Sequence, residues 1–324
     1  MMNQKMKYVT ALLLCLALLS GIATALTGCG ETQAPQGENH ATVIVCTGFA
    51  GYDFTRSILS DYRESGGEGM VQLTMLGSLG QDMHSYEPSA KDIITLASAD
   101  VIVYTGAESW LESALSSAGN RGVIRVSMME ACDAEAAHAD HDHGGEDACT
   151  LIGEDEHVWL SVENASRITR KIADALKQAD EANAAAWEAS AARYNEKLLE
   201  LRADYAAMME TVTRDTVVLA DRNPFAYLFR ELGVSCVAAF PGCSSETSAS
   251  FETQMKLIQH VKDNDLSYVL VMEGSDGKVA EVVTAETGAR VLTLHSLQVV
   301  TDVEGTTYLG VMRRNLETLK KALQ

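Results

Sequence analysis

The chain has 324 residues, with 45 acidic and 25 basic side chains and a formal net charge of −20 at pH 7. A surface of that sign repels polyanions, so we expect no nucleic-acid partner and an attraction for cations. The length suits one large domain or two ordinary ones.

The amino terminus has the pattern of an export signal. Two lysines precede a short apolar run, Leu12–Leu19, which is too short to span a membrane comfortably. The run leads to Leu-Thr-Gly-Cys, which resembles a lipobox, and small residues stand directly before Cys29 as signal cleavage requires. We therefore expect a signal peptide over residues 1–28, acylation of Cys29 and a polar tether over residues 29–40. The alternative is a secreted protein with an ordinary cleavage site.

The next part of the chain alternates short β-branched runs with segments of helical spacing. Strands are predicted at 41–49, 71–76, 100–106 and 122–127, and helices at 52–65, 89–99 and 108–119. Such alternation implies a mostly parallel sheet covered by helices on both faces.

Residues 161–212 contain no Gly or Pro and are rich in strong helix formers. The pattern predicts two helices with a break near residues 179–183. The second helix, about residues 182–212, would be about 45 Å long at 1.5 Å per residue, long enough to span a domain.

The alternation then restarts. Strands are predicted at 216–221, 235–240, 267–273 and 290–296, and helices at 224–232, 253–264, 278–288 and 306–324. The predicted fold is therefore α/β, with an N-terminal lobe over residues 41–180, a long rigid connecting helix over 181–213 and a C-terminal lobe over 214–324. Ligands of such sheets bind outside the carboxyl ends of the strands, so two facing lobes would form a cleft that holds the ligand between them.

Five cysteines lie beyond the predicted anchor, and an exported protein can oxidise them. Their number is odd, so at least one thiol stays free or pairs outside the chain. Cys132 with Cys149 and Cys236 with Cys243 are possible pairs, and the sequence leaves the pairing among them and Cys46 open.

Two histidines stand where the site is expected. His84 follows a predicted strand in a glycine-containing turn beside Asp82 and Glu87, and His157 follows acidic residues and precedes an apolar helix start. A single loop histidine is usually a polar surface residue. Neutral imidazole is nevertheless the commonest zinc ligand, and a neighbouring acid can fix its tautomer.

The segments around these histidines resemble a known family. Residues 82–88, Asp-Met-His-Ser-Tyr-Glu-Pro, and residues 155–160, Asp-Glu-His-Val-Trp-Leu, are similar to the two histidine motifs of the metal-binding lipoproteins of zinc and manganese ABC transporters, the ZnuA/TroA-like cluster A-I family. Residues 294–297 and the closing helix add to a resemblance that covers residues 41–324.

The resemblance implies a function and a location. The expected protein is not an enzyme; it binds Zn²⁺ with high affinity and delivers it to an ABC permease and its ATPase. It would be an extracytoplasmic monomer, anchored to the cell membrane as a lipoprotein.

The resemblance also implies metal ligands. His84 matches the family's first ligand and His157 its second, and His295 stands where the family has Asp. The family's third ligand corresponds to Arg222, which stays protonated and cannot bind a cation. Arg222 is expected to act as electrostatic support through a carboxylate that lies between it and the metal.

A fourth ligand remains open. The candidates are Asp221, Cys243 and Glu246, and water could also serve. Cys243 could instead form a disulfide or be idle, and Glu246 could cap the following helix. Glu273 is expected to stabilise its lobe through hydrogen bonds or an ion pair. Three imidazoles favour zinc, because manganese prefers more oxygen ligands.

A histidine-rich acidic tract lies within residues 132–149, between the first-lobe sheet and His157. Zinc-specific members of the family carry such a loop there, and it is expected to bind metal weakly as an accessory. Its candidate ligands are His138, Asp140, His141, Asp142 and His143. The alternative is an acidic loop with incidental histidines.

Other functions remain possible at this stage. A manganese or other divalent-metal binder of the same family is one, and an adhesin or metal buffer without a transporter is another. An extracellular zinc hydrolase is disfavoured, because the sequence has neither His-Glu-x-x-His nor Gly-x-Ser-x-Gly.

Overall fold

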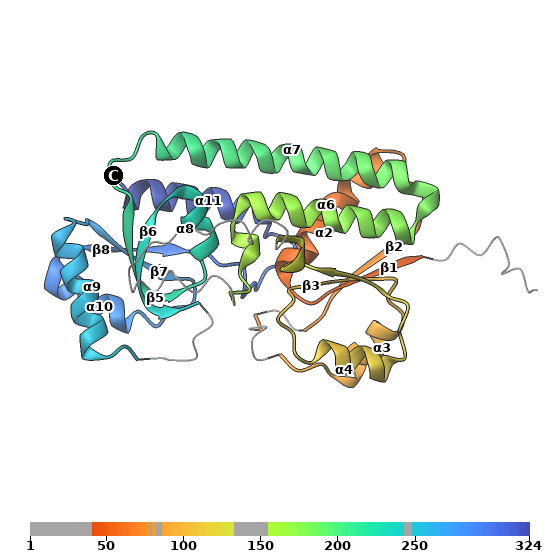
Figure 1. The fold of residues 1–324 in the computed structure, drawn as a ribbon, viewed down its shortest axis with the longest axis horizontal. Coiled ribbons are helices and arrows are strands. Elements are labelled where there is room, and N and C mark those ends of the chain that lie inside the picture. Colours follow the sequence, from red (N-terminus) through yellow and green to blue (C-terminus); the bar gives the residue numbers. More distant parts are fainter. Residues whose placement is uncertain (1–40, 78–79, 82–85, 133–154, 243–247) are drawn as a thin grey trace, which may run out of the picture. The chain divides into compact units, whose positions relative to one another are not determined.

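Two parallel four-stranded sheets organise the protein. The computed structural model describes residues 41–77, 80–81, 86–132, 155–242 and 248–324, all of them within one unit, Ala41–Gln324. Within these residues each sheet is flanked by helices, and a long helix runs past both sheets (Figure 1).

The first sheet has the strand order β2-β1-β3-β4. Its strands are β1 (Thr42–Cys46), β2 (Val71–Met75), β3 (Val101–Tyr104) and β4 (Ile124–Ser127), and its helices are α2 (Phe49–Glu64), α3 (Ala90–Ala97) and α4 (Leu111–Ala118). Ile44 and Cys46 pack with α2, whereas Val45 and Ile102 pack on the opposite face with α3 and α4. Both faces are therefore buried, which explains why β1 is almost uniformly apolar.

The second sheet has the order β6-β5-β7-β8. Its strands are β5 (Thr216–Asn223), β6 (Ser235–Pro241), β7 (Tyr268–Met272) and β8 (Arg290–Leu294), and its helices are α8 (Ala226–Leu232), α9 (Phe251–Asp263), α10 (Lys278–Thr287) and α11 (Tyr308–Ala322). Val218 and Val269 pack towards α9 and α10, and Leu219 and Leu270 pack towards α8 and α11. The two sheets thus follow the same plan.

Two helices connect the lobes. They are α6 (Val162–Ala179) and α7 (Ala184–Met209), joined through a short 3₁₀ turn at Glu181–Asn183. The 26 residues of α7 span about 39 Å. Trp187 of α7 stacks on Tyr62 of α2 with ring centroids 3.7 Å apart, and the Tyr205 hydroxyl donates to the Met312 carbonyl of α11 at 2.7 Å. The connecting helix therefore packs against elements of both lobes.

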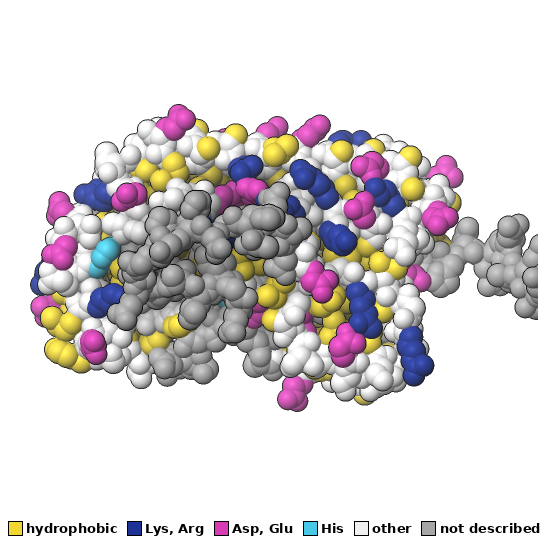
Figure 2. Space-filling model, viewed as in Figure 1, with side chains coloured by type: hydrophobic (Ala, Val, Ile, Leu, Met, Phe, Trp, Pro, Cys, Tyr) yellow, Lys and Arg dark blue, Asp and Glu magenta, His cyan; other side chains and the backbone are white. Residues whose placement is uncertain are grey.

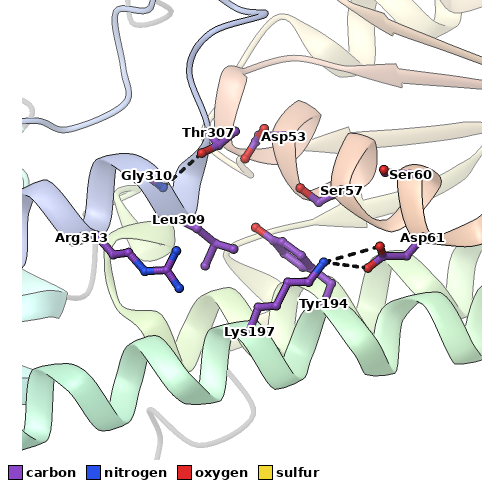
Figure 3. Close-up of a pocket in the computed structure, with 10 residues that line it drawn as sticks. All are labelled: Asp53, Ser57, Ser60, Asp61, Tyr194, Lys197, Thr307, Leu309, Gly310 and Arg313. Carbon is purple, nitrogen blue, oxygen red and sulfur yellow. Dashed lines mark hydrogen bonds and ion pairs between the residues drawn. The ribbon is translucent and has the colours of Figure 1, made fainter.

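Direct hydrogen bonds also join the lobes on this helical side. The Asp53 carboxylate of α2 accepts from the Tyr308 backbone N–H at 2.7 Å, and the Tyr308 hydroxyl donates to the Trp159 carbonyl at 2.9 Å. A cavity of about 280 Å³ lies between α2, α7 and α11 (Figure 3). Lys197 and Asp61, which line it, form an ion pair at 3.1 Å. None of the candidate metal ligands lines this cavity.

The predicted fold class is confirmed: two parallel α/β lobes are joined by a long helix. Several predicted strands end early: β1 stops at Cys46, with Phe49 already in α2, and β8 stops at Leu294 and not at residue 296. The Ser296 N–H donates to Glu273, and its carbonyl accepts from the Trp159 indole, so these groups leave the ladder. Strand β5 is longer than predicted and ends at Asn223.

Acidic and basic side chains are interspersed over the face that carries α6 and α7 (Figure 2). Among the described residues, no helix is both long and apolar enough to cross a membrane.

Candidate metal centre

His157 is the best-defined element of the site. It directly precedes a 3₁₀ turn, Val158–Leu160, and its side chain is fully buried. The Asp155 carboxylate accepts from its Nδ1 at 2.5 Å and from its backbone N–H at 2.9 Å. A carboxylate only accepts, so the proton sits on Nδ1 and the lone pair sits on Nε2, the nitrogen that would bind a metal. A neighbouring acid therefore fixes the tautomer of this imidazole.

The second lobe closes around this pair. The Tyr227 hydroxyl of α8 donates to the Asp155 carbonyl at 2.9 Å. A side-chain carbon added at Gly242, just after β6, would lie 2.8 Å from the Asn223 carbonyl oxygen and 3.3 Å from His157 Nδ1. Only glycine leaves room for this approach. His157 belongs to the first-lobe side of the chain, yet Gly242, at the carboxyl end of β6, lies close to its ring.

Hydrogen bonds from three different elements fix His295 and Ser296, which follow β8. Asn315 of α11 accepts from the His295 N–H at 2.9 Å and donates to its carbonyl at 2.8 Å. The Ser296 N–H and hydroxyl donate to the Glu273 carboxylate, the hydroxyl at 2.6 Å, and the Trp159 indole donates to the Ser296 carbonyl at 3.0 Å. Glu273 is thus a hydrogen-bonding residue of its lobe, as expected.

Gln298 is a site residue that the sequence did not reveal. Its side-chain amide nitrogen contacts Nε2 of His157. The two residues are 141 positions apart. Two residues further on, the Val300 carbonyl accepts from the Gly80 N–H at 2.9 Å, next to the segment that leads to His84. A polar residue three positions after His295, in the loop that leaves a strand end, was the only available signal.

Asp221 and Arg222 lie near the end of β5, where the predicted support pair was placed. The Asp221 carboxylate accepts from the backbone N–H groups of Arg222 at 2.8 Å and Met272 at 3.4 Å. These bonds use one lone pair on each oxygen, so Asp221 keeps lone pairs that could bind a metal and stays a candidate. In the part of the chain that the structure describes, the Arg222 guanidinium forms no ion pair. Its support role stays a prediction.

Several predicted site residues lie outside the described residues: His84, Cys243, Glu246, the tract His138, Asp140, His141, Asp142 and His143, and Cys29. Among the residues that are described, no three His, Cys, Asp or Glu side chains gather as a metal site. The structure brings together His157, Asp155 and Gln298, and it places the His295 backbone on the adjoining segment. One buried imidazole with an acid partner fits a zinc ligand.

The cysteine pairing also stays open, since Cys149 and Cys243 lie outside the described residues. Cys46, Cys132 and Cys236 are buried. Burial raises the pKa of the Cys46 thiol to about 12, against a smaller lowering effect of the Thr55 hydroxyl. Cys46 is therefore a neutral core side chain at physiological pH.

Two α/β lobes with a buried acid–histidine pair between them are the arrangement expected of a two-lobed solute-binding protein. The model of one family, "Zinc-uptake complex component A periplasmic", matches residues 44–322. The chain belongs to this ZnuA family. This confirms the family that the resemblance in the sequence indicated.

Individual relatives agree with this family. The chain is 28% identical over 315 residues to the "Zinc-binding lipoprotein AdcA" of Streptococcus pneumoniae, covering 94% of this chain and 60% of the relative. It is 27% identical to the "High-affinity zinc uptake system protein ZnuA" of Bacillus subtilis, covering 86% of this chain and 87% of that one. The chain therefore spans about 60% of the length of the AdcA relatives.

A solved structure shows the same fold. The Zn(II)-bound ZnuA-like domain of Streptococcus pneumoniae AdcA is 27% identical, with a TM-score of 0.67, and the match covers 88% of this chain and 99% of that domain. The chain thus matches the ZnuA-like part of the longer relative.

Proposed function

We propose that this protein captures Zn²⁺ outside the cytoplasmic membrane and delivers it to an ABC permease and its ATPase. The observation that carries the proposal is the buried His157, whose Nδ1 is held by Asp155 while Nε2 faces a residue of the segment after β8. Membership of a zinc-uptake family and relatives named for zinc binding support the choice of metal.

The proposed ligands come from both lobes. They are His84, His157 and His295, with Cys243, Glu246 or Asp221 as a fourth. Zinc accepts imidazole, thiolate and carboxylate in a tetrahedral site, whereas manganese prefers more oxygen. Arg222 would support the site through a neighbouring carboxylate, either Asp221 or Glu246.

The proposed location follows from the family and the amino terminus. The family description is periplasmic and a relative is named a lipoprotein, which supports an extracytoplasmic position. Cys29 would carry the lipid and residues 29–40 would form the tether to the membrane. We propose a monomer, with the permease as its partner.

Metal titration tests the ligand set. Isothermal titration of the purified protein with Zn²⁺ and Mn²⁺, with a competing chelator, should show one tight zinc site. His157→Ala should weaken it by orders of magnitude, and the triple change of His84, His157 and His295 to Ala should abolish it. His260→Ala is the matched control, because it removes a histidine that is not a proposed ligand. His260 lies on α9, and its Nε2 is 2.8 Å from the Thr216 hydroxyl oxygen.

Two outcomes would contradict the proposal. Stoichiometric tight zinc in the triple variant would show that the ligands lie elsewhere. Tighter binding of manganese than of zinc would place the protein with the manganese binders. Delivery is tested separately: deleting the gene should reduce growth in zinc-depleted medium, and unchanged zinc uptake would favour a buffer or an adhesin.

A further inference from the structure

One wall of the cavity between α2, α7 and α11 carries a buried hydroxyl group. Tyr194 of α7 lines this cavity and is 1% exposed, and its hydroxyl has no hydrogen-bond partner among the described residues (Figure 3). We propose that the cavity binds a small oxyanion, a phosphate or a carboxylate, which accepts from the Tyr194 hydroxyl and from the Arg313 guanidinium. The inference does not depend on zinc, because none of the described candidate metal ligands lines this cavity.

The Tyr194 hydroxyl is available to a ligand. A buried tyrosine hydroxyl normally finds a partner, because leaving it unsatisfied costs free energy. Burial and the Asp53 charge raise the pKa of Tyr194, and Ser57 lowers it by a smaller amount. The Ser57 hydroxyl is therefore near, but the two hydroxyls do not meet in hydrogen-bond geometry. Figure 3 shows the hydroxyl end of Tyr194 pointing away from α7, towards the space between α2 and α11, so it can donate its proton there.

The charges around the cavity favour an anion over a cation. The Asp53 carboxylate pairs with Arg56, and the Asp61 carboxylate pairs with Lys197 at 3.1 Å. Arg313 of α11 also lines the cavity, and within the part of the chain that the structure describes it forms no ion pair. Both carboxylates therefore have a cation of their own, whereas the guanidinium of Arg313 can donate to a ligand. A cation in this cavity would meet positive charge that no carboxylate balances.

The start of α11 adds to this preference. Thr307 caps this 15-residue helix by accepting from the Gly310 N–H at 3.1 Å, and both residues line the cavity. A helix N-terminus carries a partial positive charge that stabilises a nearby anion. The cavity, at about 280 Å³, lies just below the range of about 300–1,000 Å³ that is typical of sites for larger ligands, so it suits a small ion.

Non-specific attraction would not explain anion binding by this protein. Its formal net charge is −20, which repels anions from the surface as a whole. Saturable binding of an anion would therefore have to come from local donors. Because Tyr194 lies on the connecting helix and Arg313 on a helix of the second lobe, the bound ion would join these two elements.

The test titrates the purified protein, in zinc-free buffer, with inorganic phosphate and separately with succinate, while chloride keeps the ionic strength constant. Titration calorimetry is the readout, because phosphate also stabilises proteins without binding a site. Saturable binding of phosphate would identify a phosphate ligand, and saturable binding of succinate a carboxylate ligand. Tyr194→Phe should weaken the binding roughly 10- to 100-fold, the effect of one hydrogen bond to a charged group. Arg313→Gln should weaken it about tenfold or more.

Two neighbouring residues supply matched controls. Tyr205 lies on the same helix and is equally buried, but its hydroxyl already donates to the Met312 carbonyl at 2.7 Å. Tyr205→Phe should leave anion binding unchanged and lower the midpoint of urea unfolding. Without anion, Tyr194→Phe should not lower that midpoint, because it removes no hydrogen bond within the protein. Arg314→Gln removes a guanidinium that does not line the cavity, and it should bind the anion like wild type.

Three results would overturn the proposal. Absence of saturable binding for both anions would mean that solvent alone serves the Tyr194 hydroxyl. Equal binding by wild type, Tyr194→Phe and Arg313→Gln would place the anion elsewhere. A midpoint of urea unfolding that falls as far in Tyr194→Phe as in Tyr205→Phe, with no anion present, would make the hydroxyl a structural group.

Discussion

Removing the Asp155 carboxylate is the most direct perturbation of the proposed site that leaves every proposed ligand in place. Asp155 is 7% exposed, and one of its oxygens accepts from both Nδ1 and the backbone N–H of His157, at 2.5 and 2.9 Å. Its loss frees the imidazole to turn, lets the tautomer change and makes Nε2 less basic. Loss of such an outer partner typically weakens metal binding 10- to 100-fold. At about 1.4 kcal/mol per tenfold, that is about 1.4–2.8 kcal/mol.

The assay is the zinc dissociation constant of Asp155→Ala and Asp155→Asn, measured by competition with a chelator. Asn keeps an oxygen that accepts from Nδ1 but loses the charge, so its effect should lie between those of wild type and Ala. Asp276→Ala removes the same charge from an exposed position that pairs with Lys278, and its affinity should stay at the wild-type value. A folded Asp155→Ala protein with wild-type zinc affinity would refute the role of the acid–histidine pair.

Three further predictions concern pH, the acidic tract and a buried thiol. Zinc affinity should weaken steeply below pH ~6.5 in a titration between pH 7 and 5, because each ligating imidazole must be neutral and its reference pKa is about 6.5; a flat profile would speak against histidine ligands. Deleting residues 138–147 should leave the tight calorimetric event unchanged and remove only weak additional zinc equivalents. Burial raises the pKa of the Cys46 thiol from 9.0 to about 12. Below pH 9 the difference in unfolding free energy between wild type and Cys46→Ala should not change with pH. Above pH 9 only the unfolded thiol ionises, so the wild type should lose up to about 1.4 kcal/mol of unfolding free energy per pH unit relative to Cys46→Ala. Urea unfolding of both proteins at pH 8 and pH 10.5 measures this difference, and an equal loss in the two would contradict it.

Local pattern was sufficient to predict the elements. The β-branched run Thr42–Cys46 is apolar on both sides because helices cover both faces of its sheet. The break between α6 and α7 was visible because Asp180 and Asn183 interrupt a run of helix formers. The end of β8 was not visible, because Ser296 leaves the ladder through bonds to Glu273 and Trp159, which are distant in sequence.

The same distinction separates the predictable part of the site from the rest. Asp155 and His157 are two positions apart, so their hydrogen bond could be inferred from a short motif. The contact of Gln298 with His157 and the close approach of Gly242 depend on how the second lobe packs against the first. A residue that is polar and lies in a loop gives no local sign of such a partner.

The contrast between His157 and the histidine-rich tract explains why one site should be tight and the other weak. The His157 ring is buried, its Nδ1 is held by Asp155, and its position is bounded by Gly242, so folding has already fixed it before the metal arrives. The tract contains two glycines and four acids within residues 138–147, and gathering several of its ligands on one ion costs roughly 1–2 kcal/mol for each residue that becomes ordered. Its acids add an attraction that salt screens.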